Sequence, residues 1–241
     1  DFEEFLWATN NERLAQAIHE SFLSDTPLPE ALHTAAIELY KHYLIIGGMP
    51  AVVQNYLETG KLLDVADLQS KILNEYIADM AKYATNTESV RIRAAYNSIP
   101  SQLAKDNKKF QYKVVQKGGN AALFGSSIDW LCFAGVVLKC QRIEQAIQPI
   151  TVYSDMSSFK LYMGDVGLLT MKSGIAQQTV LSVLGADNSF LGALSENYVA
   201  QAFAAKGYNL FYWESKSIAE IDFVLQKQEK IIPVEVKAGT N

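Results

Sequence analysis

Two mostly apolar runs flank a short polar segment in the stretch Ile221-Asp-Phe-Val-Leu-Gln-Lys-Gln-Glu-Lys-Ile-Ile-Pro-Val-Glu-Val-Lys237. Because strand side chains point alternately to two faces, this pattern predicts strands at Ile221–Leu225 and Ile231–Val236. Residues Gln226–Lys230 are expected to form the loop of a hairpin between them. The pattern therefore predicts an antiparallel pair of strands at the end of the chain.

This hairpin is expected to bring charged side chains together. Its spacing places Asp222 beside Glu235, with Lys237 close by, and Glu196 on the preceding helix can supply a third acid. Carboxylates suit Mg²⁺, and an ammonium beside the metal can position water and offset charge on a phosphate. We therefore expect the catalytic residues Asp222, Glu235, Lys237 and Glu196, with Asp222 and Glu235 as the metal ligands.

A plainer interpretation stays open for the same residues. Asp222, Glu235 and Lys237 can equally form an exposed cross-strand ion pair that contributes little to stability. Pro233 removes a backbone donor from the second strand and favours an edge or a kink at that position. Local spacing does not decide between the two interpretations.

An α/β unit is predicted around the hairpin. Phe190–Lys206 has a helical pattern, and strands are expected at Phe159–Met163 and Tyr208–Trp213. Gly164–Thr170 is expected to form a turn, and Gly174–Asn188 to be rich in loops. These elements, together with the hairpin, form the expected C-terminal domain.

The rest of the chain is expected to be mostly helical. The pattern of its middle part predicts three helices followed by a two-stranded ribbon, which is the winged-helix order. The expected helices are Val90–Leu103, with a bend near Pro100, Tyr112–Lys117 and Ser126–Ala134, and the expected strands are Val136–Ile143 and Ile150–Tyr153. Before it, amphipathic helices are expected at Asn10–Phe22, Glu30–Ile46 and Lys61–Tyr83. The expected fold class is α+β, with a helical segment at 1–86, a winged-helix-like domain at 87–155 and an incomplete α/β restriction-endonuclease-like domain at 156–241.

Charge is unevenly distributed along the chain. Seven basic residues and one acid give the segment from Arg91 to Lys117 a charge of +6, which leaves −11 for the remainder of the net −5. Such a segment is typical of a surface that contacts nucleic-acid phosphates, although lysine-rich loops are usually only solvated. The candidate DNA contacts are Lys105, Lys108, Lys109 and Lys113.

Composition excludes several classes. The longest mostly apolar uncharged stretch, Trp130–Leu138, is far shorter than the roughly 20 residues of a membrane span. Cys132 and Cys140 fit neither a disulfide framework nor a zinc knuckle, so we expect reduced core thiols in a cytoplasmic protein without a membrane partner. No serine or cysteine stands in a recognisable nucleophile motif.

Several segments, in this order, resemble a known family: Tyr43-Leu-Ile-Ile-Gly-Gly-Met-Pro50, Phe159-Lys-Leu-Tyr-Met-Gly-Asp-Val-Gly-Leu168, Gly192-Ala-Leu-Ser-Glu-Asn-Tyr-Val199, Glu220-Ile-Asp-Phe-Val224 and Pro233-Val-Glu-Val-Lys237. They look like motifs of a prokaryotic AAA+ type ATPase family, which joins an N-terminal P-loop ATPase to a C-terminal region of unassigned role. The opening Asp1-Phe-Glu-Glu-Phe-Leu6 resembles the segment that follows the ATPase core. The end of the chain is similar to the PD-(D/E)XK nuclease fold, and the resemblance implies Glu196, Asp222, Glu235 and Lys237 as its site.

The resemblance also implies what this chain lacks. No G-x-x-x-x-G-K-[ST] loop occurs, so ATP binding and any homo-oligomer are expected only through a missing N-terminal ATPase domain. The expected function is an accessory region of an ATPase, with DNA binding and a Mg²⁺-dependent nuclease-like site that is either active or silent. The alternatives are a non-catalytic DNA-binding module and a protein-interaction scaffold.

Overall fold

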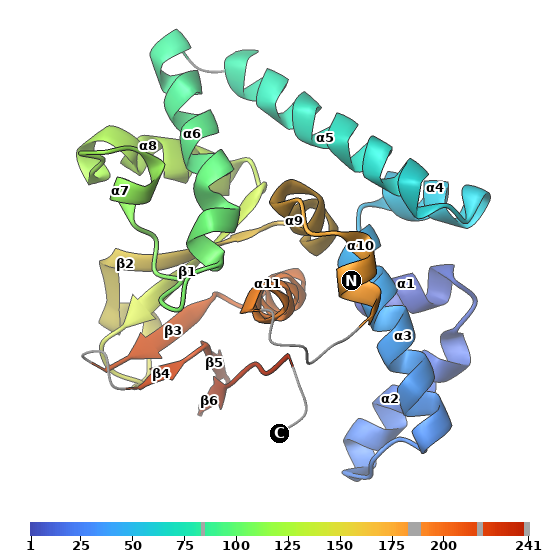
Figure 1. The fold of residues 1–241 in the computed structure, drawn as a ribbon. Helices are drawn as coiled ribbons and strands as arrows, with labels where there is room; N and C mark the ends of the chain where they lie inside the picture. Colours follow the sequence, from blue (N-terminus) through green and yellow to red (C-terminus); the bar gives the residue numbers. More distant parts are fainter. Residues whose placement is uncertain (83–84, 183–188, 216–218, 239–241) are drawn as a thin grey trace.

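The computed structural model describes residues 1–82, 85–182, 189–215 and 219–238, and their fold is α+β, as predicted (Figure 1). Five helices precede the middle part: α1 (Phe2–Ala8), α2 (Glu12–Ser24), α3 (Glu30–Ile46), α4 (Pro50–Thr59) and α5 (Leu62–Lys82). The three long amphipathic helices of the prediction correspond to α2, α3 and α5; Tyr83, the expected end of the last, lies outside the described residues. None of the described helices combines the length and apolar character needed to cross a membrane.

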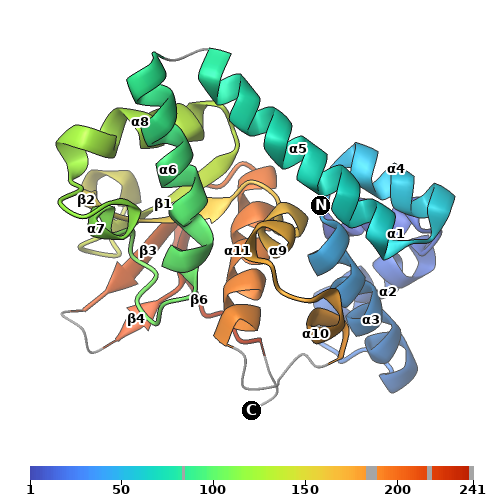
Figure 2. The same cartoon turned by 45° about the horizontal axis from the view of Figure 1, so that its top comes forward.

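The middle part contains α6 (Asn86–Leu103), α7 (Tyr112–Val115), α8 (Ala121–Phe133) and β1 (Val137–Ile143). The Thr85 and Glu88 side chains form a capping box at the start of α6, and the helix continues through Pro100. Helix α5 spans the distance between α4 and α6 (Figure 2).

The predicted strand Ile150–Tyr153 is wrong, because these residues form the 3₁₀ helix η1. Their β-branched composition suggested a strand, but Ile150 is instead a buried anchor that packs with Ile143, Phe211 and Val224. The partner of β1 is β2 (Ser154–Met163), which runs antiparallel to it. The predicted pairing of the two ribbon strands is therefore wrong, because β1 pairs with the strand that contains Phe159–Met163, which was predicted for the C-terminal domain.

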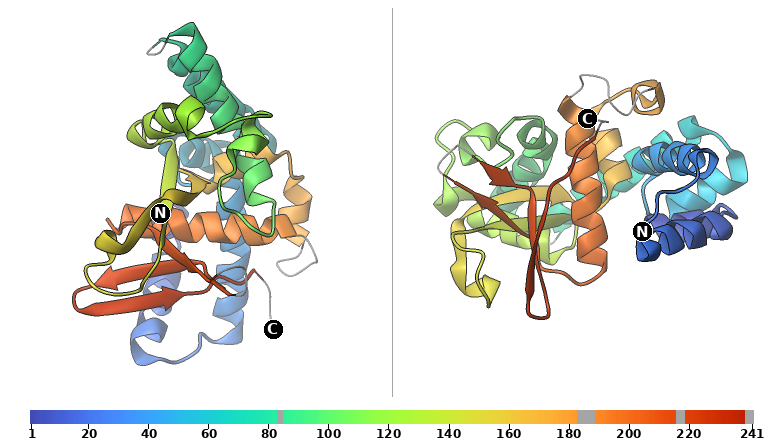
Figure 3. Two further views of the ribbon diagram at one scale, coloured as in Figure 1. Left: turned by 90° about the vertical axis from the view of Figure 1, so that its left-hand side faces the viewer. Right: turned by 90° about the horizontal axis from the view of Figure 1, so that it is seen from below.

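Strand β1 also joins the middle of the chain to its end. It pairs in parallel with β3 (Phe211–Glu214), which pairs with β4 (Glu220–Ile221), so the sheet order is β2-β1-β3-β4. A separate ribbon contains β5 (Phe223–Lys227) and β6 (Lys230–Val234), as Figure 3 shows. The expected boundary between residues 155 and 156 falls inside β2, and the division into three domains stays a prediction.

The predicted turn Gly164–Thr170 is wrong, because α9 (Val166–Ser173) begins there. The Asp165 side chain caps this helix by accepting a hydrogen bond from the Leu168 N–H at 2.9 Å. Gly167 lets the helix approach the Ile46 carbonyl, where a Cβ atom would collide with backbone. A capping aspartate and a packing glycine therefore have the same composition as a turn.

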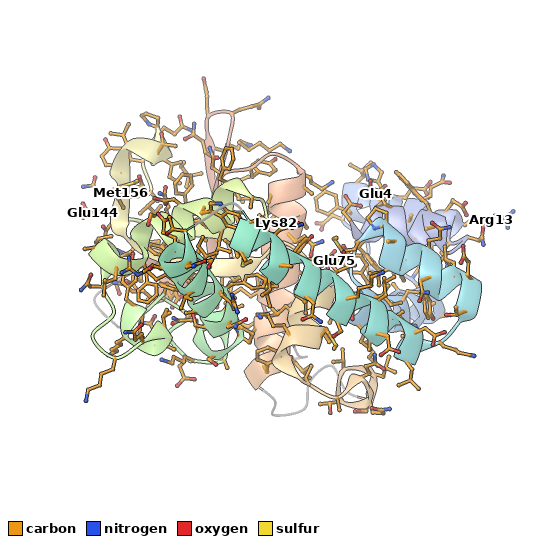
Figure 4. All side chains as sticks on the ribbon, turned by 90° about the horizontal axis from the view of Figure 1, so that it is seen from above. Glu4, Arg13, Glu75, Lys82, Glu144 and Met156 are labelled. Atoms are coloured by element: carbon orange, nitrogen blue, oxygen red, sulfur yellow. The ribbon has the colours of Figure 1, made fainter. Side chains whose placement is uncertain are left out.

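Two more helices complete the fold. Helix α10 (Gln177–Ser182) lies within the segment expected to be rich in loops, whose residues 183–188 are outside the described part. Helix α11 (Ser189–Ala205) matches the predicted helix and lies between the sheet and the N-terminal helices (Figures 1 and 2). Arg13, on α2, and Met156, on β2, lie at opposite ends of the molecule (Figure 4).

A lysine-centred carboxylate cluster

The strand predicted at Ile221–Leu225 is divided in the structure between β4 and β5, and Asp222 lies between these two strands. Ile221 pairs with Trp213 in the larger sheet, whereas Phe223 pairs with Val234 in the β5–β6 ribbon. The Asp222 carboxylate accepts a hydrogen bond from the Val236 N–H at 2.8 Å. Asp222 and Glu235 are the next residues beyond the last backbone pair, Phe223 and Val234, and their carboxylates are close enough to repel each other.

Glu235 and Lys237 do not join Asp222 in a compact group. Both follow the end of β6, both side chains are about half exposed, and the Lys237 ammonium is paired with the Glu235 carboxylate. Glu235 still repels Asp222, which helps to raise the pKa of Asp222 after the larger effect of its burial. The plainer interpretation, an exposed ion pair, therefore describes these two side chains, and their predicted catalytic roles stay predictions.

Glu196 is the most deeply buried of the predicted site residues, with 2% of its side chain exposed. One carboxylate oxygen accepts hydrogen bonds from the Lys160 ammonium, at 2.9 Å, and from the Tyr162 hydroxyl. The other oxygen is paired with Lys108. Both oxygens of this carboxylate are therefore occupied by groups of the protein itself.

Lys160 is the centre of this arrangement. Its side chain is 1% exposed, and its ammonium contacts Glu196, is paired with Glu220 and lies 4.0 Å from the Asp222 carboxylate. Its Nζ atom also lies 5.1 Å from the ring centroid of Tyr212. We call Lys108, Lys160, Glu196, Glu220 and Asp222 the Lys160 cluster.

The charges of the cluster stabilise one another. Burial alone would lower the pKa of Lys160, but attraction to Glu196 and Glu220 outweighs it and raises that pKa. Burial would raise the pKa of Glu196, but the ammoniums of Lys160 and Lys108 outweigh it and lower that pKa. Lys160 and Glu196 are therefore both charged at neutral pH, and each is the main compensation for the other's burial.

The donor set of the cluster does not favour a divalent metal. Within the described residues no group of three or more His, Cys, Asp or Glu side chains has the arrangement of a metal site. Both Glu196 oxygens and one Asp222 oxygen already have partners, and the Lys160 ammonium lies among the carboxylates. Mg²⁺ binding at Asp222 and Glu235 stays a prediction.

The predicted DNA-binding lysines divide into two groups. In the loop formed by residues 104–111, which we call the lysine loop, Lys108 is paired with Glu196 and Lys109 lies 3.9 Å from Glu214. Lys105, in the same loop, and Lys113, on α7, take part in no ion pair with any described residue. Lys105 and Lys113 are therefore the better candidates for contacts with phosphates.

Three of the segments that carry the family resemblance meet in the fold. Asp165 accepts a hydrogen bond from the Gly48 N–H at 2.7 Å, and Gln201 of α11 accepts one from Val166 at 2.9 Å. The Asn197 side chain accepts a hydrogen bond from the Met163 N–H at 2.7 Å and donates one to the Met163 carbonyl at 3.1 Å. These contacts give the polar residues near Asp165 and Asn197 a structural role beside the Lys160 cluster.

Sequence reasoning missed Lys160 and Glu220. A signal was present for Lys160, because it stands among apolar and aromatic residues in the predicted strand Phe159–Met163, and a lysine buried in such a strand requires a charged partner. The period of a strand shows which residues share a face, but it does not show which helix or loop covers that face. Lys108, predicted to contact DNA, was for the same reason not connected with Glu196.

The fold and the Lys160 cluster define an α+β protein with a buried, lysine-centred group of carboxylates. Residues 37–179 match the model of a family described as a domain of unknown function, DUF8612, and the protein belongs to this family. Residues 191–241 match a second domain of unknown function, DUF4143, which is commonly found in proteins associated with AAA ATPases. No curated protein and no solved structure matches the chain.

Proposed function

We propose that this chain is an accessory region of a P-loop ATPase that binds DNA beside a nuclease-like centre and does not cleave it. The observation that carries the proposal is the contact between Lys108 and Glu196. This contact brings the lysine loop, part of the +6 segment, up to the carboxylates of the nuclease-like centre. A DNA strand that reached this centre would meet the lysine loop.

The absence of cleavage follows from the occupied carboxylates. A metal-dependent phosphodiesterase needs carboxylate oxygens that are free to bind its cation. In the Lys160 cluster those oxygens bind ammonium groups, a tyrosine hydroxyl and a backbone N–H. We therefore assign DNA binding to the surface and a structural role to the centre.

The association with an ATPase rests on the end of the chain. The DUF4143 match covers residues 191–241, which include Glu196, Asp222, Glu235 and Lys237. Together with the motif resemblance, this match supports an ATPase partner domain, through which ATP binding and oligomerisation would come.

The test is the binding and cleavage of labelled single- and double-stranded DNA over a range of salt concentrations. We expect salt-dependent binding without metal and no cleavage with Mg²⁺ or Mn²⁺. Replacing Lys105 and Lys113 together by Ala should weaken binding and lower the slope of log K against log salt by about 2, because two phosphate contacts are lost. The matched control replaces Lys227 and Lys230, which are exposed at the β5–β6 hairpin, and should bind normally.

Two outcomes would contradict this proposal in different ways. Metal-dependent cleavage that disappears in Asp222→Asn would establish an active nuclease. A lack of DNA binding even at low salt would instead favour the protein-interaction scaffold.

The scaffold is the second candidate because α1 and α2 expose large apolar side chains. Phe22 is 82% exposed, Leu23 69% and Trp7 49%. Phe22 and Phe2 also line one hollow with Tyr198 of α11. If the DNA proposal holds, replacing Phe22 and Leu23 by Ser should leave DNA binding unchanged. If the scaffold alternative holds, the same replacement should reduce self-association or binding of the ATPase part.

A further inference from the structure

The Lys160 cluster raises the question of what compensates its buried carboxylates. Glu196 and Asp222 are 2% and 15% exposed, and Glu220 is 33% exposed. Buried carboxylates require cations or hydrogen-bond donors to balance the loss of water. In a metal centre a divalent ion supplies this balance, whereas here ammonium groups supply it.

Lys160 reaches all three carboxylates from within the fold. It is on β2, where its Cα partner across the sheet is the buried Cys140, and the neighbouring strand residues Phe159 and Leu161 are buried as well. Residues 158–163 of β2 are all buried, so Lys160 meets its carboxylate partners inside the fold. Its position among Glu196, Glu220 and Asp222 is therefore fixed by the sheet.

We propose that Lys160 takes the place of a divalent cation in this centre, so that the native protein binds no metal there and removal of its ammonium creates a metal site. The inference rests on the nuclease-like centre of the proposed function, but it does not depend on DNA binding. It gives the centre a defined chemical state, in which ammonium groups of the protein balance most of the charge of three carboxylates, and it names Lys160 as the main cause.

Lys108 has a different part in the cluster. It comes from the lysine loop, keeps 20% of its side chain exposed and contacts only the outer oxygen of Glu196. Removing its charge leaves Lys160 in place. Loss of Lys108 should therefore not create a metal site, whereas loss of Lys160 should.

The experiment compares the thermal unfolding of the native protein, Lys160→Met and Lys139→Met in EDTA and in millimolar Mg²⁺ or Mn²⁺. Methionine replaces the four-carbon stem of lysine by an unbranched apolar chain of similar length and removes the ammonium. Lys139, on the neighbouring strand β1, contacts Asp129 and the Phe159 ring outside the cluster, so its variant is the matched control. We expect Lys160→Met to melt lower in EDTA and to regain about 5 °C with metal, while the other two proteins do not respond.

A second variant distinguishes metal binding from a general effect of salt. Lys160→Met combined with Glu196→Gln removes one positive and one negative charge, so it should fold more stably than Lys160→Met and lose the response to metal. If Lys160→Met does not fold, titration of the native protein with Mn²⁺, followed by electron paramagnetic resonance, still decides the question. Native protein should show no site, and a site that disappears in Asp222→Asn would overturn the inference.

A folded Lys160→Met protein without any response to metal would also overturn it. DNA binding by the native protein is measured in metal-free buffer, independently of the unfolding experiments. Failure of the DNA proposal would therefore appear as loss of binding with the metal response of Lys160→Met intact.

Discussion

Lys160 is buried and Lys172 is partly buried, and their surroundings shift their pKa values in opposite directions. Lys160 lies among carboxylates, which raise its pKa. Lys172 donates a hydrogen bond to the Asn97 side chain at 2.6 Å and lies 4.4 Å from the centroid of the Tyr96 ring. These neutral partners do not offset its desolvation, and burial lowers its pKa to about 8.

The amine of Lys172 should therefore titrate near pH 8. Because an unfolded lysine keeps its proton up to about pH 10.4, the unfolded state binds more protons between these values, and this residue makes stability rise with pH there. The measurement is the pH dependence of the lysine side-chain NMR shifts, assigned with Lys172→Arg. A Lys172 signal that titrates above pH 10 would contradict the burial argument.

At the scale of the element, the helices with a long apolar stripe were predictable, because helical period and capping residues are local. Helix α9 was not, since Asp165 and Gly167 have the composition of a turn and act through contacts with Gly48 and with the end of α3. The register between Asp222 and Glu235 was predictable from the period of two. The break of the strand at Asp222 was not, because it depends on a second sheet partner, β3.

Asn197 connects helix α11 to strand β2, because its side chain forms hydrogen bonds with both the backbone N–H and the backbone carbonyl of Met163. Asn197→Ala should lower the free energy of unfolding by about 3 kcal/mol, since a buried N–H and a buried carbonyl lose their partner. Asn197 has no exposed surface, whereas Asn74, on α5, is exposed.

Urea unfolding checks this prediction, with Asn74→Ala as the control that should change stability by less than about 0.5 kcal/mol. Equal effects of the two variants would show that the contact between α11 and β2 does not stabilise the fold.

At the scale of the whole molecule, the Lys160 cluster connects segments that are far apart in the sequence. The lysine loop supplies Lys108, β2 supplies Lys160, α11 supplies Glu196, and the region of β4 supplies Glu220 and Asp222. This distribution is the reason why sequence analysis found the acids of α11 and the hairpin but not their partners. A cluster of this kind should also make the stability of the fold depend on pH.

For Glu196, the direction of the pKa shift determines how its contribution to the free energy of unfolding changes with pH. Its pKa in the folded protein lies below the ordinary 4.5, since the attraction of Lys160 and Lys108 outweighs its burial. Its stabilising effect is therefore present above that ordinary value and is lost as the pH falls through the lower folded value. Glu196→Gln should be less stable than the native protein at pH 7, and the difference should shrink below about pH 4.

Urea unfolding at several pH values measures this difference, and taking it between two proteins cancels the titration of the acids outside the Lys160 cluster. A difference that stayed constant between pH 7 and pH 3 would show that the charge of Glu196 does not stabilise the fold.

The central claim is that an ammonium, and not a metal ion, lies among the carboxylates of the Lys160 cluster. A crystal structure of the native protein grown with Mn²⁺, with anomalous scattering data, tests it most directly. We predict no anomalous peak at the Lys160 cluster and a Lys160 ammonium within hydrogen-bond distance of Glu196. A manganese ion bound by Asp222 and Glu235, with Lys160 turned away from Glu196, would contradict the account.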